Sequence, residues 1–153
     1  MPDGDVCATL DAQLSDTAAL LGRVPAERVD YRYAPGKWSV REVVSHVNDA
    51  ERLFAFRAFW VARGFVSPLP SFDQETAARH AGAADRSWSS HMEEFQSIRA
   101  STLHLFRHLP ADGWLRHGIA SDHSFTVRAF AYIAAGHVTH HAMILRDRYL
   151  ASV

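Results

Sequence analysis

The sequence contains a single cysteine, Cys7, among 153 residues. One cysteine cannot form an internal disulfide, and it excludes a zinc site built from several thiolates. Because Cys7 lies close to the N-terminus, we expect it to be a free thiol of no special role. The lack of a disulfide framework favours a reducing compartment, and we predict a cytoplasmic protein.

Long apolar runs and a strong charge of either sign are also missing. No uninterrupted apolar segment approaches the roughly 18 residues that a membrane-spanning helix requires. The first ten residues, MPDGDVCATL, are acidic and lack the positive segment of a secretory signal peptide. The formal net charge is -1, so no overall basic field favours nucleic acid. We therefore expect neither a membrane nor a nucleic-acid partner.

Internal repeats, low-complexity tracts and interdomain linkers are absent as well, which predicts one domain over residues 1–153. Apolar residues recur at intervals of three and four in four long segments. These segments predict helices at about 6–21, 40–63, 88–108 and 127–150, and a short helix is expected within 72–79. The predicted fold class is all-α, a four-helix bundle.

The boundaries of the second helix and the connections around it carry further information. Ser39 and Glu42 have the spacing of a capping box, which predicts that the helix begins there. The connection at 65–86 is long enough to cross the bundle, so the third long helix need not run antiparallel to the second. We expect the segment 111–125 to be an irregular loop.

The chain is rich in one residue type, histidine, with ten copies, and three of them lie in the stretch GHVTHH at 136–141. His137 and His141 are four residues apart, which on a helix puts their Cβ atoms about 6 Å apart on one side. Two imidazoles at this spacing can chelate one ion. His141 falls on the apolar seam of the helix and His137 lies beside it, so the pair should face inward. His140 points about 100° away, and we expect it to be exposed.

Spacing alone does not identify a metal site, because two histidines at a core edge can simply hydrogen-bond to carboxylates or carbonyls. His104 and His108 have the same spacing, but they lie off the apolar stripe of their helix and near its end, where we expect them to be exposed. A third ligand must come from another helix. The second helix offers His46, which in isolation is more typical of a packed polar residue, together with Asp49 and Glu51.

Two segments resemble a known family. The stretch GKWSVREVVSHVNDAERLFAFRAF, followed some ninety residues later by AGHVTHHAMILRDRYL, resembles the DinB/YfiT-like superfamily of four-helix-bundle metalloproteins. The shared features are a Trp-Ser helix start, a His, a Glu five residues on, and a G-H-x-x-H-H stretch on the last helix. In this chain they are Trp38, Ser39, His46, Glu51 and residues 136–141.

The resemblance implies an up-down-down-up bundle and a divalent metal, nickel or zinc, held by His46, His137 and His141. It also implies a homodimer. The role of Glu51 stays open: it either orients a ligand histidine or is a charge on the helix surface. Asp49 is an equal candidate for the orienting role, since ligand histidines usually donate their second N–H to such a partner.

Three neutral imidazoles would leave the full charge of the ion and one open position for water or a substrate thiol. The resemblance implies two outcomes, a hydrolase or an S-transferase for a low-molecular-weight thiol such as bacillithiol or mycothiol, acting on a small molecule. A non-catalytic metal- or ligand-binding stress-response bundle is the alternative, and an interaction module without metal is a third interpretation.

Several residues of 111–125 either line the mouth of the site or form ordinary surface: Trp114, Arg116, His117, Asp122 and His123.

Overall fold

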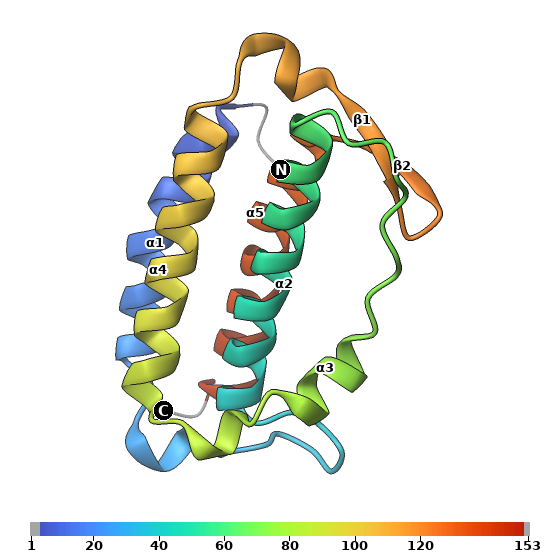
Figure 1. The fold of residues 1–153 in the computed structure, drawn as a ribbon. Helices are drawn as coiled ribbons and strands as arrows, with labels where there is room; N and C mark the ends of the chain where they lie inside the picture. Colours follow the sequence, from blue (N-terminus) through green and yellow to red (C-terminus); the bar gives the residue numbers. More distant parts are fainter. Residues whose placement is uncertain (1–3, 152–153) are drawn as a thin grey trace.

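A computed structural model describes residues 4–151, and most of them lie in four long helices (Figure 1). The long helices are α1 (Val6–Gly22), α2 (Val40–Ala62), α4 (Trp88–Arg107) and α5 (Val127–Ile144). The shorter elements are η1 (Ala26–Arg28), α3 (Gln74–His80), η2 (Ala83–Asp85), η3 (Ala111–Leu115), β1 (His117–Ala120), β2 (His123–Thr126) and the π-helical turn η4 (Leu145–Tyr149). None of the helices between residues 4 and 151 has both the length and the apolarity to cross a membrane.

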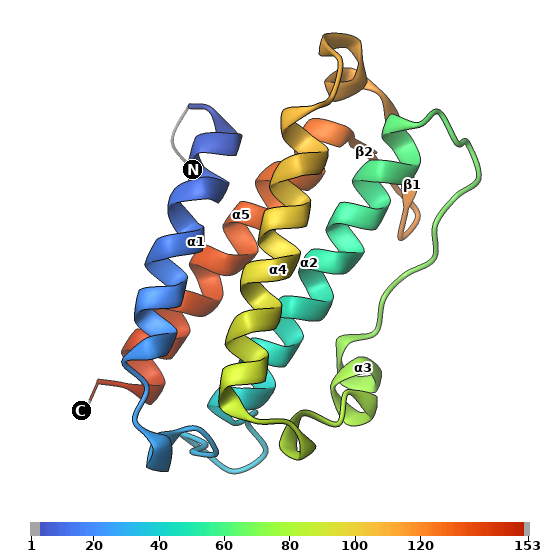
Figure 2. The same ribbon diagram turned by 60° about the vertical axis from the view of Figure 1, so that its left-hand side comes forward.

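The long helices run in the up-down-down-up order. In Figure 1, α1 descends, α2 and α4 both ascend, and α5 descends. The chain between α2 and α4 returns along the outside of the bundle and carries α3. Helix α2 packs against α4 and α5, and α1 packs against the same two helices (Figure 2). The predicted fold class is confirmed, and the two parallel neighbours, α2 and α4, need the long connection that the sequence supplies.

Each long helix begins at a polar side chain that accepts a hydrogen bond from the first turn: Asp5, Ser39, Ser87 and Thr126. The capping box of α2 forms completely. The Glu42 amide donates to Ser39 Oγ at 3.2 Å, and the Ser39 amide donates to Glu42 Oε2 at 2.7 Å. This cap fixes where α2 begins, and therefore which face of the helix carries His46.

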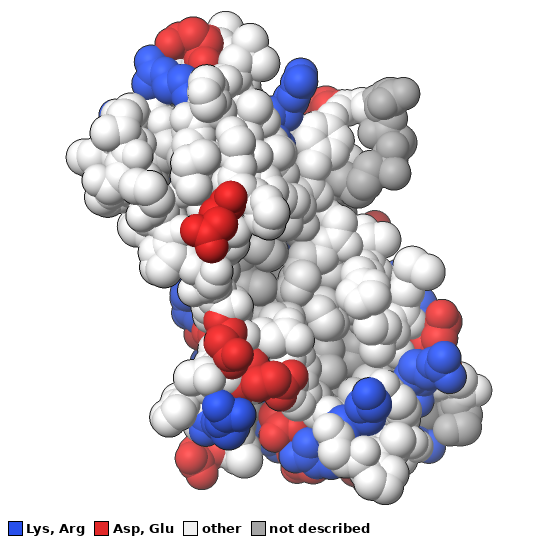
Figure 3. Space-filling model, turned by 90° about the vertical axis from the view of Figure 1, so that its right-hand side faces the viewer, with Lys and Arg blue, Asp and Glu red and all other residues white. Residues whose placement is uncertain are grey.

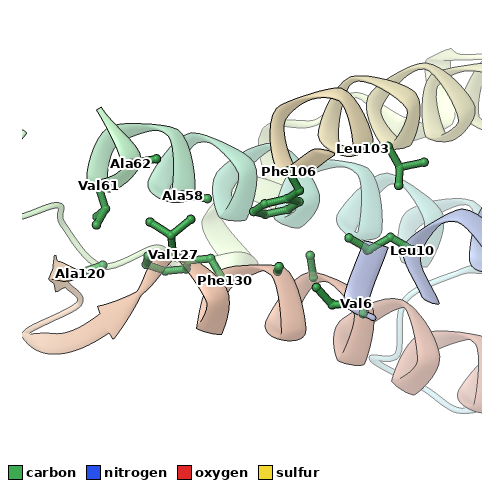
Figure 4. Close-up of a cluster of buried hydrophobic side chains, with 13 residues drawn as sticks. Val6, Leu10, Ala58, Val61, Ala62, Leu103, Phe106, Ala120, Val127 and Phe130 are labelled. Carbon is green, nitrogen blue, oxygen red and sulfur yellow. The ribbon is translucent and has the colours of Figure 1, made fainter. Parts of the chain in front are cut away.

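Two apolar clusters occupy opposite ends of the bundle. The cluster at the hairpin end includes Leu10, Ala58, Phe106 and Phe130 (Figure 4). The cluster at the other end includes Leu21, Val40, Val43, Val44, Leu145 and Tyr149. Along α2 the interval between these clusters holds a set of buried polar side chains: Ser45, His46, Asn48, Glu51 and Arg57. The middle of α2 thus carries several of the polar side chains that are buried in the bundle.

The prediction of an irregular loop at 111–125 is wrong. The segment forms η3 and an antiparallel hairpin in which His117 pairs with Thr126 and Ala120 with His123. Its two-residue turn has positive φ at Ser121 (51°) and Asp122 (64°), a geometry that is usually adopted by Asn-Gly. The Ser-Asp pair lacks this usual signal, so the sequence did not indicate a hairpin. The hairpin also holds the long connection: the Leu69 amide donates to Ile119 O, and the Ser121 amide donates to Leu69 O.

Candidate metal centre

Three histidines from two helices converge between α2 and α5. His46 on α2 and His137 and His141 on α5 each offer a ring nitrogen, and these nitrogens all lie within 4.8 Å of one another. His46 Nε2 and His137 Nε2 are 3.1 Å apart. The His141 ring centroid is 5.0 Å from that of His46 and 4.5 Å from that of His137. Within residues 4–151 this is the one group of three or more His, Cys, Asp or Glu side chains with such geometry.

The direction of each side chain relative to the core explains which histidines meet. His46 is buried, and His137 and His141 are half-buried on the inner face of α5. His140 is exposed, as predicted. His104 and His108 on α4 have the same four-residue spacing as the α5 pair, but both are exposed, which confirms that spacing alone does not decide.

Apolar and aromatic neighbours surround the three imidazoles. The Trp38 ring lies 4.8 Å from that of His46, and the Phe54 ring lies 5.5 Å from that of His137. His141 adjoins a small apolar pocket lined by Val47, Phe95, Val138 and other residues. The imidazoles are therefore largely removed from water, which disfavours their protonated forms.

Burial lowers the pKa of all three histidines. The pKa of His137 falls to about 4 through burial and then through the neighbouring His46 and His140. The pKa of His141 falls to about 3 through burial and then through the other three histidines, His137 first. Burial also lowers the pKa of His46. At neutral pH all three are uncharged, which is the state a metal ligand requires.

The donor set fits a divalent ion. Two nitrogens on one tetrahedral ion, each about 2.0–2.1 Å from it, are separated by roughly 3.3 Å, close to the 3.1 Å between His46 and His137. Imidazole suits zinc and nickel. In addition, His141 Nδ1 is buried without a hydrogen-bond partner among the described residues. A cluster of neutral imidazoles that leaves a ring nitrogen unsatisfied is poorly explained by protein hydrogen bonds alone.

Neither acidic residue of α2 contacts the histidines. Glu51 is 2% exposed, so its interpretation as a surface charge is wrong. Both of its carboxylate oxygens accept from Arg99 of α4, at 2.6 and 2.8 Å, and none of the hydrogen bonds between described residues joins it to a histidine. Asp49 pairs with Arg52 at 3.4 Å and likewise has no hydrogen bond to a histidine in the described part of the chain. The orienting role expected of one of them is not seen.

A cavity of about 270 Å³ adjoins the histidine cluster. Its lining combines α2 and α5 with the long connection and the hairpin turn: His46, Ala50, Leu53, Phe54, Arg57, Phe72, Gln74, Ser121 and His137. The hairpin, the connection and α3 lie on one side of the molecule (Figure 1), and Figure 3 shows that side with few charged residues near its middle.

The residues suggested for the mouth of the site are not part of this lining. Trp114 packs against Phe106 in the apolar cluster, and Arg116 donates to Ala62 O and Asp112. The hairpin contributes Ser121 instead. Arg57, Gln74 and Ser121 were not predicted to line the site. Of these, only Arg57 carries a signal in the sequence, because it is a cation between the apolar-stripe positions Phe54 and Ala58 of α2.

The up-down-down-up order and the three-histidine cluster define a class of four-helix bundle with a candidate metal site between the second and the last long helix. A model of the DinB superfamily matches residues 9–145, and the chain belongs to this superfamily. A search of curated proteins found no match to the sequence.

Solved structures share the fold. YfiT from Bacillus subtilis, described as a probable metal-dependent hydrolase with an unusual four-helix bundle topology, is similar with a TM-score of 0.70 and 16% identity over 95% of this chain and 89% of its own. The mycothiol-dependent maleylpyruvate isomerase gives 0.77 and 12% identity, over 94% of this chain and 60% of its own. The DinB-like protein YjoA from Bacillus subtilis gives 0.68 and 17%, over 97% and 91%. At these identities the likeness shows the fold alone.

Proposed function

We propose that this protein is a metal-dependent enzyme in which His46, His137 and His141 hold one divalent ion, nickel or zinc. The observation that carries the proposal is the convergence of three imidazoles beside a cavity of about 270 Å³. Uncharged, largely buried nitrogen donors that face one another, with room for a small molecule next to them, fit a catalytic site better than a structural one.

The bound ion would supply Lewis-acid chemistry at a position that the three histidines leave open. The chain supplies the rest. Trp38 and Phe54 limit the movement of the His46 and His137 rings. The apolar residues around His141 keep water from that side, and the cavity beside His46 and His137 admits substrate from the other.

Two reaction types are open to such a site, hydrolysis and transfer of a low-molecular-weight thiol. Each has a parallel among the structural relatives, YfiT as a probable metal-dependent hydrolase and the isomerase as a mycothiol-dependent enzyme. Apart from His46 and His137, which are assigned to the metal, none of the described residues lining the cavity is a His, Asp or Glu that could act as general base for water. A thiol has an ordinary pKa of about 8.5 and needs less help to lose its proton, so this observation favours thiol transfer.

Metal analysis of purified protein tests the ligand set. We expect near-stoichiometric divalent metal in the parent protein and a strong loss in both His46→Ala and His137→Ala. His104→Ala and His140→Ala are matched controls on exposed histidines and should retain the metal. Unchanged metal content in His46→Ala would rule out the site between α2 and α5.

Activity assays test the chemistry. A panel of low-molecular-weight thiols with an electrophilic acceptor, and a parallel panel of ester and amide substrates, would be run before and after chelator treatment. We expect turnover that chelator abolishes and added metal restores. Turnover that survives chelation would contradict the Lewis-acid mechanism. Stoichiometric metal without turnover on either panel would favour a non-catalytic metal- or ligand-binding protein.

A further inference from the structure

The cavity beside the histidine cluster contains a buried cation, Arg57 of α2. Its side chain is 7% exposed, and it lines the cavity with His46 and His137. Arg57 Nη2 donates to Pro70 O at 2.7 Å and to Ser121 Oγ at 3.0 Å. The guanidinium therefore lies where the long connection, the hairpin turn and α2 meet.

This guanidinium is short of acceptors. Its Nε is buried with no hydrogen-bond partner, and Nη1 has none among residues 4–151. No carboxylate in the described part of the chain forms an ion pair with Arg57, whereas the other deeply buried arginine, Arg99, is paired with Glu51. Burying a charge without a countercharge is costly, and proteins usually avoid it unless a ligand provides the partner.

The rest of the cavity is suited to an anion with a short apolar body. Ser121 Oγ accepts from Arg57, so its own proton is free to be donated, and the Gln74 amide is a further donor. Leu53, Phe54 and Phe72 provide apolar walls. A volume of about 270 Å³ is slightly below the range typical of drug-sized ligand pockets, which limits the occupant to a small molecule.

We propose that Arg57, assisted by the Ser121 hydroxyl, binds a carboxylate group of the substrate, whose other end reaches the histidine cluster. The substrate class is then a small carboxylic acid that carries a metal-binding group such as a thiol or a carbonyl. A planar guanidinium beside a hydroxyl donor matches the two oxygens of a carboxylate. The inference rests on the proposed function, because it assigns the second end of the same substrate.

The subsite can be tested without the metal. The metal-free chain, labelled with ¹⁵N, would be titrated with propionate and with its neutral isostere propionamide, and followed by NMR. We expect saturable shifts at the Phe72 and Ser121 amides and at Arg57 Nε–H with propionate only. Arg57→Gln should weaken propionate binding at least tenfold. Arg52→Gln removes an exposed arginine of the same helix and should leave it unchanged.

A purely structural role for Arg57 predicts a different result, since Arg57 also ties the connection to the hairpin. In that case propionate and propionamide would behave alike in the parent, and the inference would be overturned. If Arg57→Gln does not fold, Ser121→Ala keeps the bond from Arg57 to Pro70 and should reduce the preference for propionate severalfold. An unchanged preference in Ser121→Ala would also count against the inference. Methyl phosphate binding more tightly than propionate would overturn the carboxylate assignment.

The metal-loaded protein separates this inference from the proposed function. Calorimetric titration with 3-mercaptopropionate and with the neutral 3-mercapto-1-propanol compares two thiols that differ in the carboxylate. We expect the acid to bind about tenfold more tightly in the parent, as for one charge-assisted hydrogen-bonded pair, and equally in Arg57→Gln. A protein that binds propionate at Arg57 but takes up no metal would refute the proposed function alone. Metal-dependent thiol binding with no carboxylate preference would refute the inference alone.

Discussion

The chemistry of the site depends on keeping three imidazoles uncharged inside a bundle. His46, His137 and His141 lie against aromatic and apolar side chains, and burial is the largest cause of the lowered pKa of each. Proton competition for the ring nitrogens is therefore weak at neutral pH. The same burial has a cost at low pH, where an unfolded histidine would be charged.

Acid should destabilise the metal-free protein through these histidines. The unfolded histidine has a pKa of 6.5, whereas His137 titrates at about 4 in the folded chain. Between these values the unfolded chain binds more protons than the folded chain. The contribution of the uncharged, buried His137 to the free energy of unfolding is therefore complete above pH 6.5 and is lost as the pH falls toward 4. We expect Tm to fall by on the order of 5 °C more between pH 7.5 and 4.5 in the parent than in His137→Gln, by differential scanning calorimetry.

The exposed His104 of α4 supplies the control for this experiment. His104→Gln should show the same dependence of Tm on pH as the parent, because this histidine is exposed and does not contribute to the lowered pKa of His137 or His141. Equal slopes in the parent and in His137→Gln would show that His137 does not carry the acid sensitivity.

At the scale of single residues, sequence reasoning located the histidines but not their surroundings. The inward direction of His137 and the outward direction of His140 follow from helical periodicity, and both could be predicted. The ion pair of Glu51 with Arg99 and the hydrogen bond of Arg57 with Ser121 could not, because these partners lie on elements far away in the chain whose packing no local pattern records.

At the scale of helices and strands, a buried ion pair joins two parallel helices. Glu51 of α2 and Arg99 of α4 form two hydrogen bonds, and Arg99 Nη1 also donates to Leu10 O and Gln13 Oε1 of α1. Three helices thus share one guanidinium.

Removing one partner of this pair should be far more damaging than replacing both. Glu51→Ala leaves the Arg99 charge buried without its carboxylate, and we expect a loss of about 3–5 kcal/mol in the free energy of unfolding. The double variant Glu51→Leu/Arg99→Met should recover much of that loss in urea denaturation. A double variant as unstable as Glu51→Ala would contradict this account.

The metal content of Glu51→Gln separates the structural role from the orienting role expected earlier. We expect the folded fraction of this variant to bind metal like the parent, since the carboxylate contacts Arg99 and not a histidine. A selective loss of metal without a loss of stability would restore Glu51 to the support of the site.

Two glycines should respond to alanine in opposite directions. A Cβ at Gly118 of β1 would lie 2.7 Å from Val61 Cγ2, so Gly118→Ala must displace the hairpin from α2 and is expected to cost about 1–3 kcal/mol. A Cβ at Gly136 would meet nothing within 4 Å, so Gly136→Ala should stabilise α5 by roughly 0.5–1 kcal/mol. Urea denaturation of both variants measures the difference, and shifts of the same sign would contradict it.

For the elements as a whole, the long helices and their caps were predictable because periodicity and capping are local. The hairpin was not, because four-residue strands joined by a Ser-Asp turn lack the usual signals. A single helix to about residue 150 was expected at the end of the chain. In the structure α5 ends at Ile144, and the chain continues as the π-helical turn η4.

Over the whole molecule, the candidate metal would connect the second and the last long helices of the bundle. Metal binding to the folded chain alone stabilises it by mass action, by about 2.7 kcal/mol when free metal is one hundred times its dissociation constant. We expect chelator to lower Tm and added zinc or nickel to restore it. His46→Ala should show neither response, and a metal-dependent Tm in that variant would point to binding elsewhere.

The bundle order was implied by the resemblance and is compatible with the length of the connection at 65–86, whereas the cavity required the structure. Its walls come from α2, α5, the connection and the hairpin turn, and no sequence pattern shows that these four segments meet. Dimer formation and a cytoplasmic location remain predictions.

The distribution of the histidines over α2 and α5 also sets an order of events during biosynthesis. His46 precedes His137 by 91 residues, a distance that a ribosome covers in roughly 5 to 20 s. Throughout that interval the nascent chain carries one of the three histidines and lacks the helix that bears the other two. If the three histidines bind one ion as proposed, metal uptake would follow the docking of α5, and the cell would load the finished bundle and not the growing chain.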